Sequence, residues 1–278
     1  MTIILFNPLS SQGLSVNLAK KLGEKLIKEN KTVKILNILE IIDVKDFLNG
    51  FDEDDEIIIV GGDGTLHRVA NKVKDFMIKP KVYMYKAGTG NDFIRTVKVI
   101  DNLALINPHL KKLPSLTINN TEQLFINGVG IGLDGMVCYK VNQSKQLKNK
   151  SNYFKNAFKS FIESKPFDLD VNIDGKDIKL KKVWLATVMN SKYFGGGMKI
   201  APKKLRDSND LELVVVKSLP KFLLTLLFPL IYLGLHRFIL GAVKFYRGKE
   251  ISLNTNSTLY MQVDGEDIYP VSEFKTSV

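Results

Sequence analysis

The sequence is poor in the residues on which disulfide and zinc chemistry depend. Its 278 residues include one cysteine, Cys138, and three histidines that lie far apart along the chain. One cysteine cannot form an intrachain disulfide or a cysteine-rich zinc site, and the scattered histidines argue against a histidine-based metal site or triad. We therefore expect a protein of the reducing cytoplasm whose chemistry depends on other side chains.

Long apolar runs are also missing. The longest, residues 222–235, is interrupted by Pro229 and is shorter than the roughly 20 residues that a membrane-spanning helix needs. The first residues lack the basic, apolar and small-residue regions of a signal peptide. If the protein meets a membrane, we expect the association to be peripheral.

Acidic residues are outnumbered. The chain has 40 lysines and arginines against 29 aspartates and glutamates, which gives a net charge of +11. This excess suits nucleic acid, nucleotide phosphates or an anionic membrane surface. No pattern of stacking aromatics and arginines marks a nucleic-acid platform, so we expect no nucleic-acid partner. The length and the 45% apolar content predict two domains, each with its own core.

The most informative stretch runs from Asp55 to Val73. Four apolar residues at 57–60 lead into Gly61, Gly62, Asp63, Gly64 and Thr65. Apolar residues then recur at helical spacing, so the order is strand, glycine turn, helix. That order directs backbone N–H groups at an anion, and the glycines allow positive φ and close approach of a phosphate. We expect Thr65 to cap the helix.

Asp63 does not suit a simple phosphate loop. A carboxylate repels phosphate unless a divalent cation or a reacting hydroxyl lies between them, so Asp63 indicates chemistry and not storage of an anion. A turn aspartate that caps the helix is the structural alternative. The loop has neither the Gly-Lys-Ser/Thr of a Walker A motif nor the dinucleotide-binding fingerprint.

Two further predicted strands, residues 3–6 and 82–85, also end in polar or glycine-rich loops. The alternation of strands and helices predicts a doubly wound parallel sheet, whose ligands bind at the carboxyl ends of its strands. We expect the three loops to converge on one site, and the third loop to enter another helix. The candidate binding residues in the two additional loops are Asn7, Pro8, Ser11, Gly88, Thr89, Gly90 and Asn91.

The pattern changes near residue 115. Strand-like runs dominate from there, with helices expected at residues 136–146, 153–164 and 220–245. The sequence thus predicts an α/β domain, residues 1–115, followed by a mainly β domain. Near its end, Asp264 and Glu266 would project to the same side if the backbone is extended, and both could face one site. Asp-Gly is also a strong hairpin signal, so an exposed turn is the alternative.

Five segments occur in the order seen in the diacylglycerol kinase catalytic family. They are GGDGT at 61–65, GTGNDF at 88–93, NGVGIGLDG at 127–135, YFGGGMKIAP at 193–202 and VDGE at 263–266. The chain resembles this family, which includes bacterial soluble lipid kinases, sphingosine kinases and ceramide kinases, over essentially its whole length. GGDGT alone is shared with NAD kinases and phosphofructokinases, whereas the five motifs together are specific to lipid kinases.

The resemblance implies an architecture that the patterns give only in part. Residues 1–115 would bind the nucleotide, residues 116–267 would form a β-sandwich for the lipid substrate, and the tail, residues 268–278, would return to the first domain. The active site would lie in the cleft between the domains. ATP and Mg²⁺ would be the cofactors, and a lipid hydroxyl at a membrane surface the phosphoryl acceptor.

The resemblance also implies roles for individual residues. Backbone N–H groups of the GGDGT and GTGNDF loops would hold the phosphates, while Asn7 and Thr89 would fix the nucleotide. Asp63 would reach magnesium. Asp264 would orient and deprotonate the lipid hydroxyl, and Glu266 would complete the acidic network.

Two departures from the family pattern stand out. Ser11 and Gln12 occupy the places of a Ser-Gly pair that precedes a basic residue, so a phosphate-neutralising cation is missing there. Asp207 and Asp210 stand, with altered spacing and without the glycine, where the family has residues associated with a second, structural magnesium. That second metal site is therefore doubtful.

Residues 220–245 would form so wide an apolar surface that a helix here cannot be wholly solvated. The helix could be buried against the β domain, or it could be an acyl-chain entrance or a membrane-docking face. Basic residues nearby in sequence would assist the second role: Lys203, Lys204, Arg206, Lys221, Arg237 and Lys244.

The resulting hypothesis is a cytoplasmic, peripherally membrane-associated lipid kinase, with diacylglycerol giving phosphatidic acid as the first candidate reaction. A NAD kinase-like enzyme is one rival. A catalytically idle nucleotide- or lipid-binding regulator is another, and the altered loop at Ser11 favours it. Retention of Asp63, Asp264 and Glu266 argues against an idle protein, because mere binding needs no carboxylate beside phosphate. A homodimer is left open.

Overall fold

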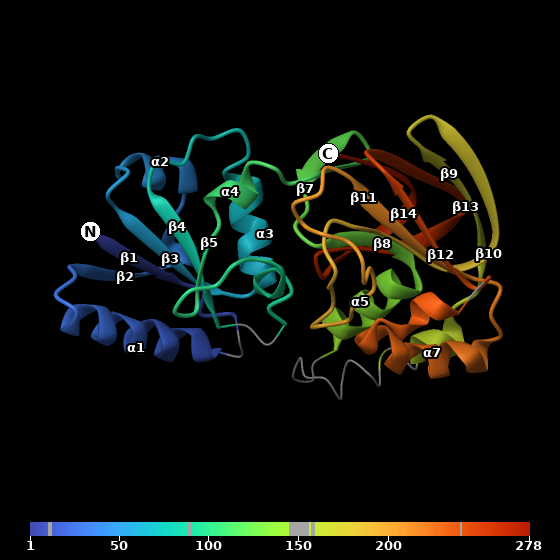
Figure 1. Cartoon of the computed structure of the whole chain (residues 1–278), viewed down its shortest axis with the longest axis horizontal. Helices are drawn as coiled ribbons and strands as arrows, with labels where there is room; N and C mark the ends of the chain where they lie inside the picture. Colours follow the sequence, from blue (N-terminus) through green and yellow to red (C-terminus); the bar gives the residue numbers. More distant parts are fainter. Residues whose placement is uncertain (11–12, 88–89, 145–155, 157–158, 240) are drawn as a thin grey trace. The chain divides into compact units, whose positions relative to one another are not determined.

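The computed structural model describes residues 1–278 except 11–12, 88–89, 145–155, 157–158 and 240 (Figure 1). The chain divides into two compact units, Met1–Leu113 and Pro114–Val278. The division falls two residues before the expected one at 115/116. Each unit has its own sheet, so each can be described by itself.

The first unit contains a five-stranded sheet in the order β2-β1-β3-β4-β5. Its strands are β1 (Thr2–Phe6), β2 (Val33–Asn37), β3 (Glu56–Gly61), β4 (Lys81–Lys86) and β5 (Leu103–Leu105). The first four are parallel, as the sequence pattern predicts, and β5 pairs antiparallel with β4 at the edge. The expected α/β sheet is therefore present in a mostly parallel form, with one short strand that the sequence pattern did not indicate.

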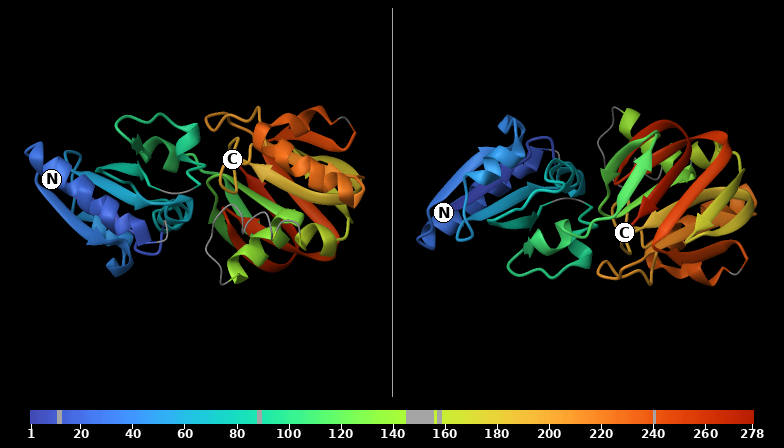
Figure 2. Two further views of the ribbon diagram at one scale, coloured as in Figure 1. Left: turned by 90° about the horizontal axis from the view of Figure 1, so that it is seen from below. Right: turned by 90° about the horizontal axis from the view of Figure 1, so that it is seen from above.

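Strand β3 shows why this sheet is covered on both sides. Residues 57–60 are each at most 1% exposed, so both faces of the strand are buried. Ile58 and Val60 pack in one cluster with α1, whereas Ile57 and Ile59 line an apolar space with side chains of the helices opposite. The helices are α1 (Leu14–Lys28), α2 (Val44–Asn49), α3 (Asp63–Lys72) and α4 (Asn107–Leu110). Figures 1 and 2 show α1 alone across one face of the sheet.

The third loop does not enter an α-helix. After it the chain makes one turn of 3-10 helix, η3 (Ile94–Thr96), and then extends. The Thr96 hydroxyl donates to the Phe93 carbonyl at 2.8 Å, and β-branched residues follow at Val97, Val99 and Ile100. Both features disfavour helix propagation, since the hydroxyl competes for backbone acceptors and branched side chains lose rotamer freedom.

The second unit is mainly β, as expected. Its strands are β6 (Ser115–Ile118), β7 (Thr121–Leu124), β8 (Gly128–Gly132), β9 (Phe167–Ile173), β10 (Lys176–Met189), β11 (Leu211–Lys217), β12 (Val243–Gly248), β13 (Glu250–Val263) and β14 (Glu266–Ser277). Strands β8 and β9 each pair with both β10 and β13, so these four close into a small barrel. The remaining strands extend it, and one apolar cluster fills the interior.

Helices cover an outer face of these strands. α5 (Leu133–Gln143) and α7 (Lys221–Leu233) contribute to a second apolar cluster with Trp184 and Val214 of the sheet (Figure 1). The helix expected at 220–245 is too long: α7 ends at Gly234, whose φ of 72° is a left-handed cap, and residues 243–248 form β12. Of the helix expected at 153–164, residues 156 and 159–163 are helical, and 153–155 with 157–158 lie outside the described residues.

The tail, residues 268–278, does not return to the first domain as expected. It forms most of β14, which pairs with β13 on one side and with β6 on the other, within the second unit. The physical reason is its apolar pattern, because Val271 and Phe274 are each 3% exposed in the core of that unit.

Candidate active site

Asn7 joins the first two loops. Strand β1 lies between β2 and β3, so the chain leaves β1 and β3 toward opposite sides, and ligands of such sheets bind at this point. Asn7 follows β1 and donates from Nδ2 to Thr65 Oγ1 at 2.8 Å, while its Oδ1 accepts from the Leu9 N–H at 3.0 Å. Asn7 is 7% exposed, so its side chain holds the loops together and does not reach outward.

Asp63 joins the third loop to the second. Its two carboxylate oxygens accept from the backbone N–H groups of Asp92 at 3.0 Å and Phe93 at 2.8 Å. The expected convergence of the three strand-end loops is thus present among the described residues. Ser11, Gly88 and Thr89, three of the predicted binding residues, lie outside them.

The other predicted residues of these loops lie beside this junction. Pro8, Gly90 and Asn91 are half-buried. Asn91 has a left-handed φ of 53°, and the Gly90 carbonyl accepts from Arg95 Nε at 3.1 Å. The exposed Arg95 side chain is thereby tied to the third loop and supplies a cation there.

The three glycines of GGDGT serve two different purposes, and neither is the expected positive φ. A Cβ atom on Gly61 would lie 2.7 Å from Thr65 side-chain atoms, so Gly61 lets β3 and the first turn of α3 approach. Among the described residues, a Cβ atom on Gly62 or Gly64 would meet nothing within 4 Å. Within that part of the chain, these two glycines face open space at the helix N-terminus, where a ligand can approach the backbone.

The start of α3 is suited to an anion. Gly62 is the N-cap residue, and Thr65 lies inside the first turn, so the expected Thr65 cap is wrong. The first N–H groups of a helix lack intrahelical acceptors and carry the positive end of the helix dipole. Here they lie at the carboxyl end of the sheet, beside Gly62 and Gly64. This arrangement can hold a phosphate group.

The residues at this junction fit one magnesium ion only in part. Asp63 is half-exposed, and each of its oxygens keeps a lone pair after accepting one N–H bond. Within the described ranges, no three His, Cys, Asp or Glu side chains group closely enough to hold a metal. Mg²⁺ commonly takes one or two carboxylates together with substrate phosphates and water, so Asp63 suits the role of a single protein ligand.

Asp264 lies in a hairpin turn of the second unit. Asp264 and Gly265 have φ values of 50° and 92°, the left-handed pair of a type I′ turn between β13 and β14. The Asp264 carboxylate accepts three backbone N–H groups, from Ile126 at 2.6 Å, Asn127 at 2.7 Å and Gly128 at 3.2 Å. The hairpin turn, one of the two sequence-based alternatives, is therefore the correct conformation. The Asp264 carboxylate holds the segment that leads into β8 by these hydrogen bonds.

Glu266 is placed differently from Asp264. It is the first residue of β14 and is exposed, whereas Asp264 is half-buried. The rule that residues two apart share a side applies to extended backbone and not across a left-handed turn, so the expectation of a shared side loses its basis.

Asp134 is a buried carboxyl that sequence reasoning did not select. It lies in the first turn of α5, accepts from Thr187 Oγ1 at 2.7 Å and is 8% exposed. Burial raises its pKa to about 7. Gly130 is required here because a Cβ atom would lie 2.0 Å from the Asp134 carboxylate. An aspartate inside the apolar, glycine-rich NGVGIGLDG segment was the available signal.

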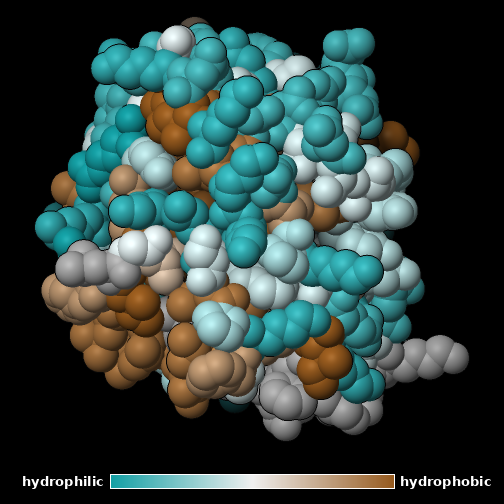
Figure 3. Space-filling view, turned by 90° about the vertical axis from the view of Figure 1, so that its right-hand side faces the viewer, coloured by the Kyte–Doolittle hydropathy of each residue, from teal (hydrophilic) through white to brown (hydrophobic). Residues whose placement is uncertain are grey.

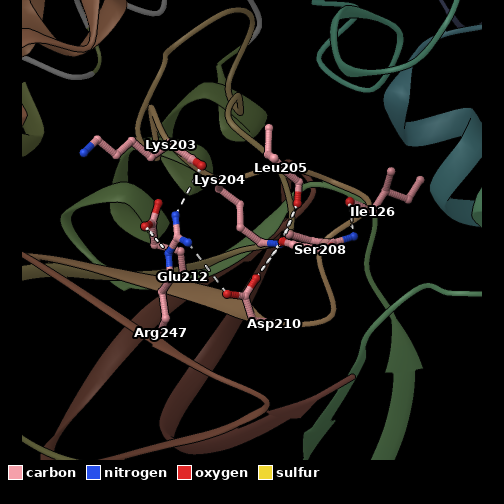
Figure 4. A network of polar contacts seen from close by, with 9 residues as sticks. Ile126, Lys203, Lys204, Leu205, Ser208, Asp210, Glu212 and Arg247 are labelled. Atoms are coloured by element: carbon pink, nitrogen blue, oxygen red, sulfur yellow. Dashed lines mark hydrogen bonds and ion pairs between the residues drawn. The ribbon is translucent and has the colours of Figure 1, made fainter.

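The expected second magnesium site contains a lysine instead. The side chain of Lys204 is 0% exposed, and its Nζ contacts Leu205 O at 2.8 Å, Ser208 Oγ at 2.6 Å and Asp210 Oδ1 at 3.3 Å (Figure 4). Burial lowers the pKa of Lys204, and the Asp210 charge opposes that shift. Asp207 is exposed. The Lys204 ammonium already contacts the Asp210 carboxylate and the neighbouring oxygens that a metal ion would need. Asp207 and Asp210 therefore do not fit a second magnesium.

Arg206 connects this segment to Asp264. Its guanidinium donates to the Ile126 carbonyl at 2.7 Å and to Asn127 Oδ1 at 2.5 Å, and the residue is 9% exposed. The same two residues donate their N–H groups to Asp264. Lys204 and Arg206, two of the basic residues expected to attract a membrane, are therefore internal.

Comparisons with known proteins identify the family of this chain. Residues 1–116 match the diacylglycerol kinase catalytic domain, and residues 127–275 match the YegS C-terminal NAD kinase beta sandwich-like domain. "Putative lipid kinase YtlR" of Bacillus subtilis is 29% identical over 229 residues, which cover 76% of this chain and 73% of YtlR. "Putative lipid kinase" of Staphylococcus epidermidis is 26% identical and covers 91% of this chain and 79% of its own.

Two solved structures share the fold. The crystal structure of "a putative diacylglycerol kinase" from Bacillus anthracis has a TM-score of 0.70 at 24% identity, with 99% of this chain and 91% of that chain covered. Yeast NADH kinase has a TM-score of 0.50 at 10% identity, with 100% and 80% covered. At these identities the likeness concerns the fold alone. The two domain matches, in contrast, show that the chain belongs to the diacylglycerol kinase catalytic domain family with a YegS-type C-terminal domain, a lipid kinase family whose reaction uses ATP.

Proposed function

We propose that the protein transfers the γ-phosphate of ATP to a lipid hydroxyl, with diacylglycerol as the first candidate acceptor and phosphatidic acid as the product. The observation that carries this proposal is the meeting of three strand-end loops at the open N-terminus of α3, with the Asp63 carboxylate tying two of them together. Phosphoryl transfer depends mainly on positioning and charge neutralisation, and such a junction provides both.

The phosphate-binding role belongs to backbone groups. The N–H groups of Gly62, Asp63 and Gly64 would hold phosphate oxygens, because the two glycines leave the approach open. Magnesium, when bound to ATP, neutralises charge on the transferred group, and Asp63 would hold it directly or through water. Arg95 would supply part of the positive charge that Ser11 and Gln12 do not.

The acceptor role is proposed for Asp264. Its three N–H bonds hold the carboxylate in one orientation, and a carboxylate can accept a hydrogen bond from a hydroxyl. We expect Asp264 to orient the lipid hydroxyl and receive its proton as the hydroxyl oxygen bonds to the γ-phosphorus and the bond from that phosphorus to the departing ADP breaks. Glu266 would add negative charge nearby in sequence. Both assignments extend the family resemblance.

The deciding experiment measures transfer of labelled γ-phosphate from ATP and magnesium to a lipid panel in mixed micelles, with NAD in plain buffer as a parallel arm. The panel contains diacylglycerol, monoacylglycerol, phosphatidylglycerol, a sphingoid base and a polyprenol. Label in a lipid supports the proposal and identifies the acceptor. Label in NAD alone would make the protein a NAD kinase, and no label from a protein that binds ATP would favour an idle regulator.

Matched variants separate chemistry from folding. Asp264→Asn and Asp174→Asn alter carboxylates of similar geometry, because Asp174 also lies in a left-handed Asp-Gly turn and accepts the N–H groups of Lys249 and Glu250. Each substitution should lower the free energy of unfolding by about 1–3 kcal/mol, because a backbone N–H group loses its acceptor oxygen. Only Asp264→Asn should reduce transfer, by at least about 100-fold. Equal activity of the two variants would remove the acceptor role of Asp264.

A further inference from the structure

Helix α7 is apolar on two opposite sides. Leu224 and Ile231 are 3% and 6% exposed and pack in the second apolar cluster of the unit. Phe222, Leu226 and Leu233 are 67%, 64% and 65% exposed. At 3.6 residues per turn these three lie within about 40° of one another and roughly 180° from the buried pair. Burial, the first sequence-based alternative for this helix, therefore holds for one side and does not explain the exposed side.

The exposed apolar side continues beyond the helix. Leu235 and Phe238 of the following 3-10 turn, η4 (Leu235–Phe238), are 44% and 69% exposed. Figure 3 shows apolar side chains gathered in the lower part of one face of the second unit, at the level of α7 in Figure 1. We call Phe222, Leu226, Leu233, Leu235 and Phe238 the apolar ridge. A contiguous exposed set of this kind marks an interaction surface, whereas single exposed apolar residues do not.

The sequence around the apolar ridge carries one sign of charge. From Lys217 to Lys249 there are six basic residues and no aspartate or glutamate: Lys217, Lys221, Arg237, Lys244, Arg247 and Lys249. Arg247 is paired with Glu212 at 3.0 Å, whereas Lys221 and Arg237 adjoin ridge residues directly in the sequence. Arg237 lies 5.5 Å from the ring centroid of Phe238, and the Lys221 ammonium donates to the Ile162 carbonyl at 2.6 Å at the start of α7. Apolar residues flanked by cations complement a surface that is apolar beneath anionic head groups.

The length of α7 decides how it could meet a bilayer. A helix over Lys221–Leu233 is about 20 Å long, shorter than the hydrocarbon core of a membrane. Throughout the described part of the chain, no helix is both long and apolar enough to cross a membrane. Since the opposite side of α7 is packed on the unit, the helix can only lie along the surface with its exposed side toward the lipid.

We propose that the apolar ridge docks the protein on the surface of a membrane rich in anionic phospholipid. Its purpose, access to a lipid acceptor, rests on the proposed function, but the docking itself needs neither ATP nor catalysis. The apolar side chains enter the boundary between head groups and acyl chains, and the basic residues contact the phosphates. Binding should therefore weaken with salt and with loss of anionic lipid.

The test is sedimentation with vesicles of phosphatidylglycerol and phosphatidylcholine, and with vesicles of phosphatidylcholine alone. Phe222→Glu with Leu226→Glu should weaken binding to the anionic vesicles at least about tenfold, because each side chain loses its apolar burial and adds repulsion. Ile42→Glu with Met77→Glu is the matched control, since these residues of the first unit are 96% and 80% exposed. Lys221→Gln with Arg237→Gln should weaken binding to anionic vesicles only.

Several outcomes would overturn the proposal. One is unchanged binding by a ridge variant whose circular dichroism and melting match the wild type. Another is a wild-type protein that binds neither vesicle. A third is a wild-type dimer in lipid-free buffer that the ridge substitutions convert to a monomer, which would assign the apolar ridge to a second copy of this chain.

A soluble acceptor separates docking from catalysis. A short-chain diacylglycerol below its micelle concentration should be phosphorylated equally by wild type and ridge variant. Vesicle binding without transfer to any lipid would contradict the proposed function and leave docking standing. Transfer to the soluble acceptor with undiminished vesicle binding by the ridge variant would contradict docking alone.

Discussion

At the scale of single residues, two aspartates bind segments that are distant in sequence. Asp63 receives N–H groups from residues 29 and 30 positions later, and Asp264 from residues 136 to 138 positions earlier. Hydrogen bonds to an ionised acceptor are stronger than neutral ones, so each carboxylate holds a loop in place before any ligand binds. Preorganised loops of this kind reduce the reorganisation that phosphoryl transfer would require.

The raised pKa of Asp134 predicts that the free energy of unfolding depends on pH. Its pKa is raised from 3.8 to about 7 by burial, so the folded state binds more protons than the unfolded state between those values. Its stabilising contribution is complete below pH 3.8 and is lost as the pH rises through about 7. Between pH 5 and 7 the wild type should lose stability relative to Asp134→Asn, on the order of 1 kcal/mol per pH unit.

Urea unfolding of both proteins at pH 5, 6, 7 and 8 measures this difference. Asparagine is the suitable comparison because it resembles the protonated carboxyl in shape and cannot ionise. A difference in unfolding free energy that stays constant across the series would contradict a raised pKa at Asp134.

At the scale of elements, the glycines at the start of α3 separate folding from binding. Gly61→Ala should destabilise the first unit, because the new methyl group would meet the Thr65 side chain at 2.7 Å.

Gly64→Ala should instead stabilise the first unit by up to about 1 kcal/mol, since Gly64 is helical and faces open space. If this space receives phosphate, Gly64→Ala should nevertheless weaken ATP binding. Thermal melting and calorimetric titration with ATP test both statements, and normal affinity in Gly64→Ala would contradict the phosphate site.

The segment around Lys204 is stabilised by its own internal cation. Lys204→Met should cost about 3 kcal/mol, because the Asp210 carboxylate and the Leu205 carbonyl lose their buried partner. Lys203→Met, which changes the exposed neighbour, should cost far less. A metal chelator should leave the melting temperature of the wild type unchanged. Strong chelator destabilisation together with a mild effect of Lys204→Met would show that a metal does hold this segment.

At the scale of the whole molecule, the two units depend on different parts of the chain. Because β14 lies between β13 and β6, deletion of residues 268–278 should unfold the second unit and leave Met1–Leu113 compact. Limited proteolysis followed by mass spectrometry would then detect a protected N-terminal fragment that ends near residue 113. Loss of protection in the first unit would indicate that the tail supports that unit after all.

Much of this protein follows from local sequence pattern alone. The buried strand at 57–60, the glycine turn after it and the helical spacing beyond are properties of neighbouring residues, and they suffice for an α/β domain with a strand-end site. The five motifs, read in order, indicated the lipid kinase family, which the domain matches confirm. The Asp174-Gly175 hairpin was predictable for the same reason, since two residues determine such a turn.

Only the tertiary structure decided how distant residues combine. Local sequence pattern could not show that the Lys204 ammonium contacts the Asp210 carboxylate. Nor could it show that the Asp264 carboxylate accepts hydrogen bonds from the backbone of residues 126–128. The same holds for the tail, whose alternation suits any sheet with a free edge, and for α7, whose all-round apolar character does not tell which side meets the core. Secondary structure follows from residues that are neighbours along the chain, whereas contacts between distant residues depend on which segments the fold brings together.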